Sequence, residues 1–448
     1  MNNRQSIYST RCWIDEQLQP ASISFEGGVI SAVSKSKDAD AVDMGDHIIM
    51  PGVIDAHVHI NEPGRTEWEG FETATKAAAA GGVTMLVDMP LNASPVTTTA
   101  KAFEEKRAAA KDQLYVNCGF YGGLIPGNLK DLEPLMAAGV LGIKCFLTHS
   151  GIDEFPNVSE EEVDAAMPVI AKHDIPLLAH CELENGASTT TNTGSYKDYV
   201  SSRPKQWEND AIGLMIRLCR KHRCPTHIVH VSSAEALAMI DDAKKEGLPL
   251  TAETCSHYIY FNAENIPDKN TLYKCAPPIR EKENNEALKH ALKTGVLDFI
   301  TTDHSPAPPD IKEILSGDLS KAWGGIAGLQ FLLPTSWTAL KDILSLDEFI
   351  PLITSSPAHF LHLQDRKGKI AVGFDADITI WNPEEVFEVK EEHIRHRHKI
   401  SPYTGEKLFG TVKQTIVNGE IVFDDKEIKN IIKGKIILNK PYLSAHFA

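Results

Sequence analysis

Two histidines separated by a single residue are the first feature of this sequence that suggests chemistry. His57 and His59 end an apolar run that begins at Pro51 and breaks at Pro63-Gly64. Successive side chains of a strand point to opposite faces, so both imidazoles would lie on one side and reach one metal ion. Two histidines supply only half of a tetrahedral coordination sphere, and an ordinary structural or surface pair has the same pattern. The metal hypothesis therefore needs further ligands.

Four more residues with ligand chemistry stand at or near the ends of later apolar runs: Lys144, His180, His230 and Asp303. Each has an ordinary structural explanation when taken alone, since a histidine at a strand end is commonly hydrogen-bonded and Asp303 could cap the next segment. Six such side chains on five predicted strands are hard to explain by packing. Their joint placement favours a metal centre in which Asp303 is also catalytic.

The elements that would position these residues alternate between apolar runs and helix-like stretches. Strands are predicted over residues 53–59, 83–89, 114–121, 141–147, 175–181, 226–231, 248–255 and 297–303. Helices are predicted over residues 71–80, 209–220 and 234–245, with left-handed glycine caps at Gly81-Gly82 and Gly247. Strand-helix units in such a succession indicate an α/β fold with a closed parallel (β/α)8 barrel of the TIM type. The carboxyl ends of its strands share one face, where catalysis takes place.

Both ends of the chain contain short alternating runs that are typical of strands. These are residues 11–14, 21–25, 26–30 and 47–50 at the start, and 368–372, 376–381 and 411–417 near the end. Asn418-Gly419 after the last run is a strong hairpin signal. We expect the two ends to form one small β-sandwich domain from residues 1–50 and 365–448, beside a barrel of residues 51–364.

Composition and charge exclude several classes of partner. The formal net charge of −16 and the isoelectric point near 5.6 would repel nucleic acid and anionic membrane surfaces. The eight cysteines form no Cys-x-x-Cys motif, which favours buried, reduced thiols over a disulfide framework. The first residues lack the apolar core of a signal peptide, and no later stretch is apolar enough for a membrane span. A soluble cytoplasmic protein is therefore expected.

Lys144 needs its own explanation, because a protonated amine beside metal cations is strongly disfavoured. Burial and neighbouring cations favour the neutral amine, which can add carbon dioxide to give a carbamate, N6-carboxylysine. This group is a bidentate anion that can bridge two metal ions. The alternative is a buried lysine that pairs with a carboxylate.

Two bridged metal ions would support hydrolysis. At a separation of about 3.5–4 Å they would lower the pKa of a shared water towards about 7 and polarise a substrate carbonyl. Asp303 could bind one ion, take the proton of the water and return it to a leaving nitrogen. The reaction class that fits is hydrolysis of a carbon–nitrogen bond. Zinc is the first expectation for the metal, and cobalt, manganese or iron would suit the same ligands.

On these residues the chain resembles the cyclic amidohydrolases of the amidohydrolase superfamily, over nearly its whole length. The pattern of that family is a His-x-His pair, a carboxylated lysine, two further histidines and an aspartate. It matches His57, His59, Lys144, His180, His230 and Asp303 without a gap. The resemblance implies a binuclear barrel enzyme with a split β domain, a small-molecule substrate and a homo-oligomer, often a tetramer.

Finer matches indicate the allantoinase branch of that family. Dihydroorotases typically carry an arginine for the substrate carboxylate where this chain has Asn61, and a neutral amide cannot replace a guanidinium there. Residues 88–95 and 274–280 also resemble motifs of the branch. The implied reaction opens the hydantoin ring of allantoin to give allantoate, in purine and ureide catabolism. The candidate substrate contacts are Asn61, Asn92, His149, Lys274, Cys275 and Ser305.

Several alternatives stay open. Dihydropyrimidinases usually place a tyrosine five residues after the carboxylated lysine, as a donor to the reacting carbonyl, whereas this chain has His149. His149 could take that role or have none. A hydantoinase or dihydropyrimidinase would share all the ligands and is the nearest alternative, followed by a dihydroorotase. A non-catalytic scaffold would be expected to have lost ligands, and a mononuclear deaminase would not need a bridging lysine.

Overall fold

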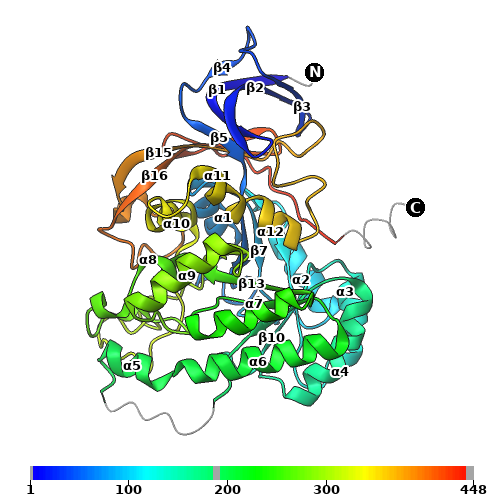
Figure 1. Cartoon of the computed structure of the whole chain (residues 1–448), viewed down its shortest axis with the longest axis vertical. Coiled ribbons are helices and arrows are strands. Elements are labelled where there is room, and N and C mark those ends of the chain that lie inside the picture. The colour runs from blue at the N-terminus through cyan, green and yellow to red at the C-terminus, as the bar shows by residue number, and fades with distance from the viewer. Residues whose placement is uncertain (1–3, 185–191, 440–448) are drawn as a thin grey trace.

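The computed structural model describes residues 4–184 and 192–439 of the chain. Figure 1 shows a barrel surrounded by helices, with a smaller β unit at the end of the molecule where the N-terminal strands lie. Both parts agree with the fold class expected from the sequence, because parallel sheets form the barrel and a separate sheet joins the two chain ends.

Parallel strands line the barrel, and their continuous apolar runs are typical of strands that are buried on both faces. In the described part of the chain they are β6 (Val53–Val58), β7 (Val83–Asp88), β8 (Asn117–Phe120), β9 (Gly122–Gly123), β10 (Ile143–Phe146), β11 (Leu177–His180), β12 (Thr226–Ile228), β13 (Leu250–Cys255) and β14 (Phe299–Thr301). They pair in the orders β6-β7-β8 and β9-β10-β11-β12-β13-β14. The strand predicted at residues 114–121 contains β8, and β9 follows it after Tyr121.

The barrel closes between its first strand and the segment after its last strand. Val58 of β6 pairs in parallel with His304, and the main-chain N–H of His59 donates to the carbonyl of His304 at 2.7 Å. The buried carboxylate of Asp55 in β6 accepts hydrogen bonds from the main-chain N–H and the hydroxyl of Thr302. Closure therefore brings the His-x-His pair next to residues 302–304.

Helices cover the outside of the barrel (Figure 1). They are α1 (Phe71–Ala80), α2 (Ala100–Ala110), α3 (Leu132–Ala137), α4 (Glu160–Ile170), α5 (Tyr196–Ser202), α6 (Lys205–His222), α7 (Leu237–Lys245), α8 (Ser256–Tyr260), α9 (Lys282–Thr294), α10 (Leu332–Leu340), α11 (Leu346–Phe349) and α12 (Ser355–Phe360). The sequence predicts a left-handed glycine at Gly81-Gly82, after the end of α1. Gly82 is the left-handed residue, with φ 81°, whereas Gly81 has φ −88°. Gly247 after α7 is left-handed as predicted, with φ 76°.

The β unit is one mixed, mostly antiparallel sheet drawn from both ends of the chain. Within the described residues its strands are β1 (Gln5–Ile14), β2 (Gln17–Glu26), β3 (Val29–Ser34), β4 (Val42–Asp43), β5 (Ile48–Pro51), β15 (Ile378–Glu388), β16 (Lys407–Val417), β17 (Glu420–Asp424) and β18 (Glu427–Ile428). The two ends join where β15 runs antiparallel to β5, with Ile378 opposite Pro51. The predicted hairpin turn links β16 to β17, with positive φ at Asn418 (50°) and Gly419 (79°).

The prediction of a strand at residues 368–372 is wrong. Gly368 and Gly373 have left-handed φ values of 78° and 89°, so the chain turns at both ends of this short run. The preceding residue, Lys367, is buried and pairs with Asp375 and Asp377 at 2.9 and 2.5 Å. The run is therefore a loop that leads into β15 rather than a strand.

The cysteines agree with the sequence prediction. All eight are buried and free. Burial raises the pKa of Cys145 to about 12, which keeps this thiol protonated and unreactive. Among residues 4–184 and 192–439, no helix has both the length and the apolar composition that a membrane crossing requires.

A buried ion pair joins helix α2 to the barrel. Lys106 Nζ lies 2.6 Å from Asp88 Oδ2 at the end of β7, and the two side chains are 1% and 0% exposed. The same amine donates to the carbonyl of Met89 at 2.9 Å, and Asp88 Oδ1 accepts the main-chain N–H of Ile60 at 2.8 Å. The pair therefore holds α2, β7 and the segment after β6 together.

Lys106→Met is expected to lower the free energy of unfolding by about 3–5 kcal/mol, because it leaves the Asp88 carboxylate buried without its partner. Lys245→Met is the matched control, since Lys245 pairs with Asp241 on the surface of α7 at 2.6 Å. The control is expected to lose less than about 0.5 kcal/mol. Urea denaturation followed by circular dichroism measures both losses, and equal losses would contradict the role of the buried pair.

Candidate metal centre and active site

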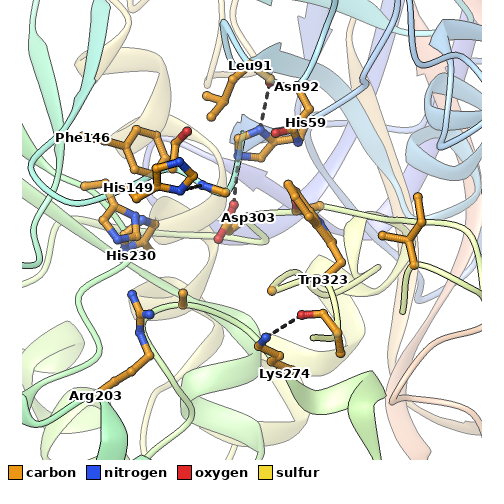
Figure 2. A pocket seen from close by; sticks show the side chains of 18 of the residues that line it. His59, Leu91, Asn92, Phe146, His149, Arg203, His230, Lys274, Asp303 and Trp323 are labelled. Atoms are coloured by element: carbon orange, nitrogen blue, oxygen red, sulfur yellow. Dashed lines mark hydrogen bonds and ion pairs between the residues drawn. The ribbon is translucent and has the colours of Figure 1, made fainter. Parts of the chain in front are cut away.

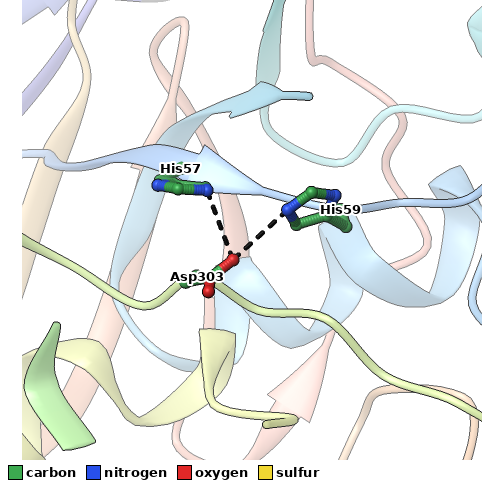
Figure 3. A group of neighbouring side chains, drawn as sticks. All are labelled: His57, His59 and Asp303. Carbon is green, nitrogen blue, oxygen red and sulfur yellow. Dashed lines mark ion pairs between the residues drawn. The ribbon is translucent and has the colours of Figure 1, made fainter. Parts of the chain in front are cut away.

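Three predicted ligands meet where the barrel closes. The ligand atoms of His57, His59 and Asp303 all lie within 4.8 Å of one another. His57 Nε2 and His59 Nε2 are each 3.2 Å from Asp303 Oδ1 (Figure 3). Because β6 pairs with the segment after β14, the first and last strands of the barrel together supply this group. Two imidazoles and a carboxylate form a donor set that suits a divalent transition metal.

The other two predicted histidines lie beside this group. His180 ends β11, and His230 stands two residues after β12. The ring centroid of His230 lies 5.5 Å from that of His57 and 4.6 Å from that of His180. The four histidines are therefore neighbours at one end of the barrel.

Lys144 of β10 has an amine without a hydrogen-bond partner among the described residues. The side chain is 0% exposed, and Nζ has no hydrogen-bond partner among the described residues. Burial lowers the pKa of Lys144 to about 8. The alternative of a lysine that pairs with a carboxylate finds no support in these contacts. A buried polar atom left without a partner is costly, so the amine is suited to a group that the polypeptide does not itself provide.

A second layer of contacts fixes which nitrogen of three of these histidines faces the pocket. His57 Nδ1 lies 2.5 Å from Glu253 Oε1, and His180 Nε2 lies 2.8 Å from Glu182 Oε2. His59 Nδ1 lies 3.0 Å from the carbonyl of Leu91 and donates to it. A histidine that donates through one nitrogen presents the lone pair of the other, as metal-binding histidines do.

Both carboxylates of this layer are ionised. Burial favours the neutral acid, but contacts with His57 and His227 outweigh it and lower the pKa of Glu253 to about 2. Glu182 behaves in the same way, because Arg203 and His180 lower its pKa to about 2 against the effect of burial. Arg203 Nε donates to Glu182 Oε1 at 3.0 Å, and its Nη2 bonds to Oε2. The guanidinium thus holds the carboxylate that orients His180.

Asp303 and His230 share an unusual backbone conformation. Their φ values are 44° and 41°, in the left-handed region that residues other than glycine rarely adopt. Such strain persists only where the surroundings fix it, and it is common at functional sites. Burial raises the pKa of Asp303, but contacts with His57 and His59 outweigh this effect and hold it well below its usual range. Asp303 is therefore an ionised carboxylate aimed at the histidines.

One pocket opens over these residues, and Figure 2 shows it from close by. All six predicted ligands line it, as do four expected substrate contacts: Asn92, His149, Lys274 and Ser305. Figure 2 places Phe146 and His149 on one side of the pocket and Trp323 and Lys274 on the other. The His149 side chain is 56% exposed, so it lies at the solvent side of the pocket.

Two expected substrate contacts do not line the pocket. Asn61 is fully buried, and its Nδ2 donates to the carbonyl of Pro306 at 3.4 Å. Its Oδ1 accepts a hydrogen bond from Asn92 Nδ2 at 3.1 Å, so Asn61 holds Asn92 in place. The Cys275 side chain is also buried, and its carbonyl accepts the hydroxyl of Tyr199 at 2.7 Å. The next residue, Ala276, does line the pocket.

The contacts of Asn61 leave Asn92 with a free acceptor. Because Asn61 donates to Pro306, its oxygen faces Asn92 and makes the amide nitrogen of Asn92 the donor. Asn92 Oδ1 is then buried and has no hydrogen-bond partner among the described residues. An N–H group of a bound ligand would satisfy this oxygen.

Sequence reasoning missed several residues of the pocket, among them Phe146, Tyr199, Arg203 and Trp323. Phe146 follows Lys144 at the spacing that puts both on one face of β10, so strand alternation could have found it. Trp323 had no such signal, because its place depends on the course of the long segment after β14.

The chain matches known proteins over nearly its whole length. Residues 48–422 match the amidohydrolase family. Allantoinase from Streptomyces avermitilis is 41% identical over 97% of this chain and 98% of that protein, and allantoinase from Saccharomyces cerevisiae is 42% identical over 84% and 82%. The structure of L-hydantoinase (dihydropyrimidinase) from Arthrobacter aurescens superposes with a TM-score of 0.89 at 29% identity, and covers 97% of this chain and 99% of that one. The chain therefore belongs to the amidohydrolase family and is a hydrolase of cyclic amides, with allantoinases among its relatives.

Proposed function

We propose that the protein hydrolyses the hydantoin ring of allantoin to give allantoate. The observation that carries the choice of substrate is the similarity to proteins named allantoinase, at 41% identity over 97% of the chain. The similarity to L-hydantoinase is lower, at 29%. The pocket supports the same choice, because it offers hydrogen-bond groups suited to a small polar substrate.

We infer that two divalent metal ions bind in the pocket, zinc being the first expectation and cobalt, manganese or iron the alternatives. His57, His59 and Asp303 would hold one ion, and His180 and His230 the other. Lys144, as a carbamate formed with carbon dioxide, would bridge them. The buried amine without a partner supports this assignment, because a carbamate would convert the group into an anion beside the ligands.

When bound, such ions would supply an activated water and polarise the carbonyl of the substrate. Asp303 would accept the proton of that water and return it to the leaving nitrogen. The water oxygen bonds to the ring carbonyl carbon, the ring carbon–nitrogen bond breaks, and the carbonyl carbon becomes a carboxylate. The low pKa of Asp303 keeps it in the ionised form that the first transfer needs.

The remaining pocket residues are assigned to binding. Asn92 Oδ1 would accept an N–H of the substrate, and Ser305 and Lys274 would donate to its carbonyl oxygens. His149 is the candidate donor to the reacting carbonyl, since it occupies the position of the dihydropyrimidinase tyrosine. Asn61 acts through Asn92 and offers no cation for a substrate carboxylate, which argues against dihydroorotate.

A hydantoinase or dihydropyrimidinase is the second candidate, favoured by the close superposition on L-hydantoinase. A non-catalytic scaffold is disfavoured, because none of the six ligand positions is lost. A homotetramer, a cytoplasmic location and the domain boundaries at residues 50–51 and 364–365 stay predictions from the sequence and the resemblance.

A substrate panel tests the proposed function. Protein reconstituted with Zn2+, Mn2+ or Co2+ is expected to open allantoin with a higher kcat/KM than hydantoin, dihydrouracil or dihydroorotate. Formation of the ring-opened carboxylate is measured for each substrate at equal metal content. Faster opening of dihydrouracil or dihydroorotate would overturn the assignment, and faster opening of simple hydantoins would favour the hydantoinase.

Lys144→Ala is expected to lower both kcat and the metal content. The loss in kcat should exceed roughly 100-fold, which is the upper end of the loss typical when a residue that supports a metal ligand is changed. Added short-chain carboxylic acids should restore part of both, because they supply an anion where the carbamate would be. Metal analysis and activity assays in parallel measure these effects. A variant that keeps two metal ions per chain would remove the bridging role of Lys144.

Glu253→Gln is expected to weaken metal retention by about 10–100-fold, because it removes the charge that orients His57. Metal content is measured after dialysis against graded concentrations of a chelator. Asp377→Asn is the control, since Asp377 is another buried carboxylate, paired with Lys367 and in contact with Asn117 rather than a histidine. Equal metal loss in both variants would indicate a general loss of stability instead.

A further inference from the structure

A buried lysine stands behind one side of the pocket. Lys312 is 4% exposed, and its Nζ donates to the carbonyls of Lys274 (3.0 Å), Trp323 (2.9 Å) and Gly325. An ammonium group has three N–H donors, so each donor has one acceptor. All three acceptors are neutral main-chain oxygens, and burial lowers the pKa of Lys312 to about 7.

The three carbonyls belong to two segments that meet at the pocket. Lys274 follows α8, and Ala322–Gly325 lies in the segment after β14; we call these residues the outer wall. The main-chain N–H of Gly325 donates to the carbonyl of Lys274 at 2.9 Å, and that of Trp323 donates to Ile311, next to Lys312, at 2.9 Å. Lys312 thus adds three bonds at the junction of both segments.

The outer wall presents two side chains to the pocket (Figure 2). Lys274 Nζ donates to the carbonyl of Ala322 at 2.5 Å, so the wall also orients this amine. Trp323 Nε1 donates to Ser305 Oγ at 3.3 Å, and its ring packs edge-on against Trp68 with centroids 4.9 Å apart. Since the reacting carbonyl must lie at Asp303 and the histidines, the outer wall is left for a substituent on the ring.

Stability alone does not explain a lysine at this place. A buried ammonium without an anion is costly, and an apolar side chain in its place would leave three carbonyls without this donor. A lysine can satisfy three separate acceptors at once, because its three donors rotate about one bond, whereas the donors of an arginine are fixed in one plane. The lysine therefore fixes the position of two segments, at Lys274 and at Ala322–Gly325, that are not paired as strands of one sheet.

We propose that Lys312 is a positioning residue for the substrate: it fixes the outer wall so that Lys274 and Trp323 hold the substituent carried by the ring. The inference rests on the proposed function, because allantoin carries a ureido substituent and hydantoin carries none. Lys312 does not line the pocket itself, so its effect is on binding of the substituent and not on the reacting groups.

The test compares allantoin with unsubstituted hydantoin in Lys312→Gln and Lys312→Met. Both variants are expected to raise KM for allantoin by about tenfold or more, with kcat changed by less than about threefold, because only binding of the substituent is weakened. KM for hydantoin, or its inhibition constant where turnover is slow, should change by less than about threefold. Lys312→Gln keeps two N–H donors and should have the smaller effect.

Two further variants separate positioning from general loosening. Lys293→Met is the matched control, because Lys293 also donates to a main-chain carbonyl, that of Ile343 at 2.9 Å, but on the surface. It should leave both substrates unaffected. Trp323→Phe should reproduce the selective rise in KM for allantoin, and the double variant with Lys312→Gln should be no worse than the worse single variant, because both changes act through one wall.

Each outcome decides a separate question. Equal effects of the Lys312 variants on allantoin and hydantoin would overturn the positioning role, as would additive effects in the double variant. If Lys312→Met does not fold, the same comparison is made with Lys312→Gln, Trp323→Phe and the double variant. A wild-type protein that opens hydantoin but not allantoin would instead overturn the proposed function.

Discussion

The site depends on one contact, the pairing of the first barrel strand with the segment after the last. This contact places His57 and His59 on one side of a narrow gap and Asp303 on the other, with Val58 beside His304. It joins the two ends of the barrel sequence, and all the other barrel strands lie between them along the chain. The left-handed backbone at Asp303 shows how closely its surroundings define it, because such a conformation costs about 1–3 kcal/mol when nothing holds it. The chemistry is thus a property of the closed barrel and not of any single strand.

Charge is arranged in layers around this contact. The histidines facing the pocket are backed by Glu253 and Glu182, and Glu182 is backed in turn by Arg203. Each carboxylate of these layers has a histidine or a guanidinium as its partner, as low-dielectric surroundings require. Lys144 departs from this pattern, since its amine has no hydrogen-bond partner among the described residues. In a purely structural polar core the polypeptide would satisfy this amine, so its unsatisfied state is typical of a site that binds another group.

The barrel and the gathering of the six ligand candidates around one pocket could be predicted because their signals are local. A strand end fixes where His180 points, and an apolar run of the right length fixes the strand itself, so alternation and turn residues were sufficient. Substrate contacts depend on how distant loops meet, which no spacing encodes. Asn61 stood next to the histidines in sequence yet lies behind Asn92, and Trp323 reaches the pocket from a segment with no regular pattern. The false strand at 368–372 failed for a related reason, because two left-handed glycines outweigh a short apolar run.

The joining of both chain ends in one sheet has a consequence for synthesis. β5 pairs with β1 on one side and with β15 on the other, so the second edge of β5 has no partner until nearly the whole chain has left the ribosome. Unpaired strand edges attract other chains, and multi-part proteins are exposed to this hazard while they are incomplete. A nascent or prematurely terminated chain that ends before Ile378 would contain the barrel residues but lack β15. One edge of β5 would then have no partner strand. Pairing of β15 with β5 therefore removes this exposed strand edge from the growing chain.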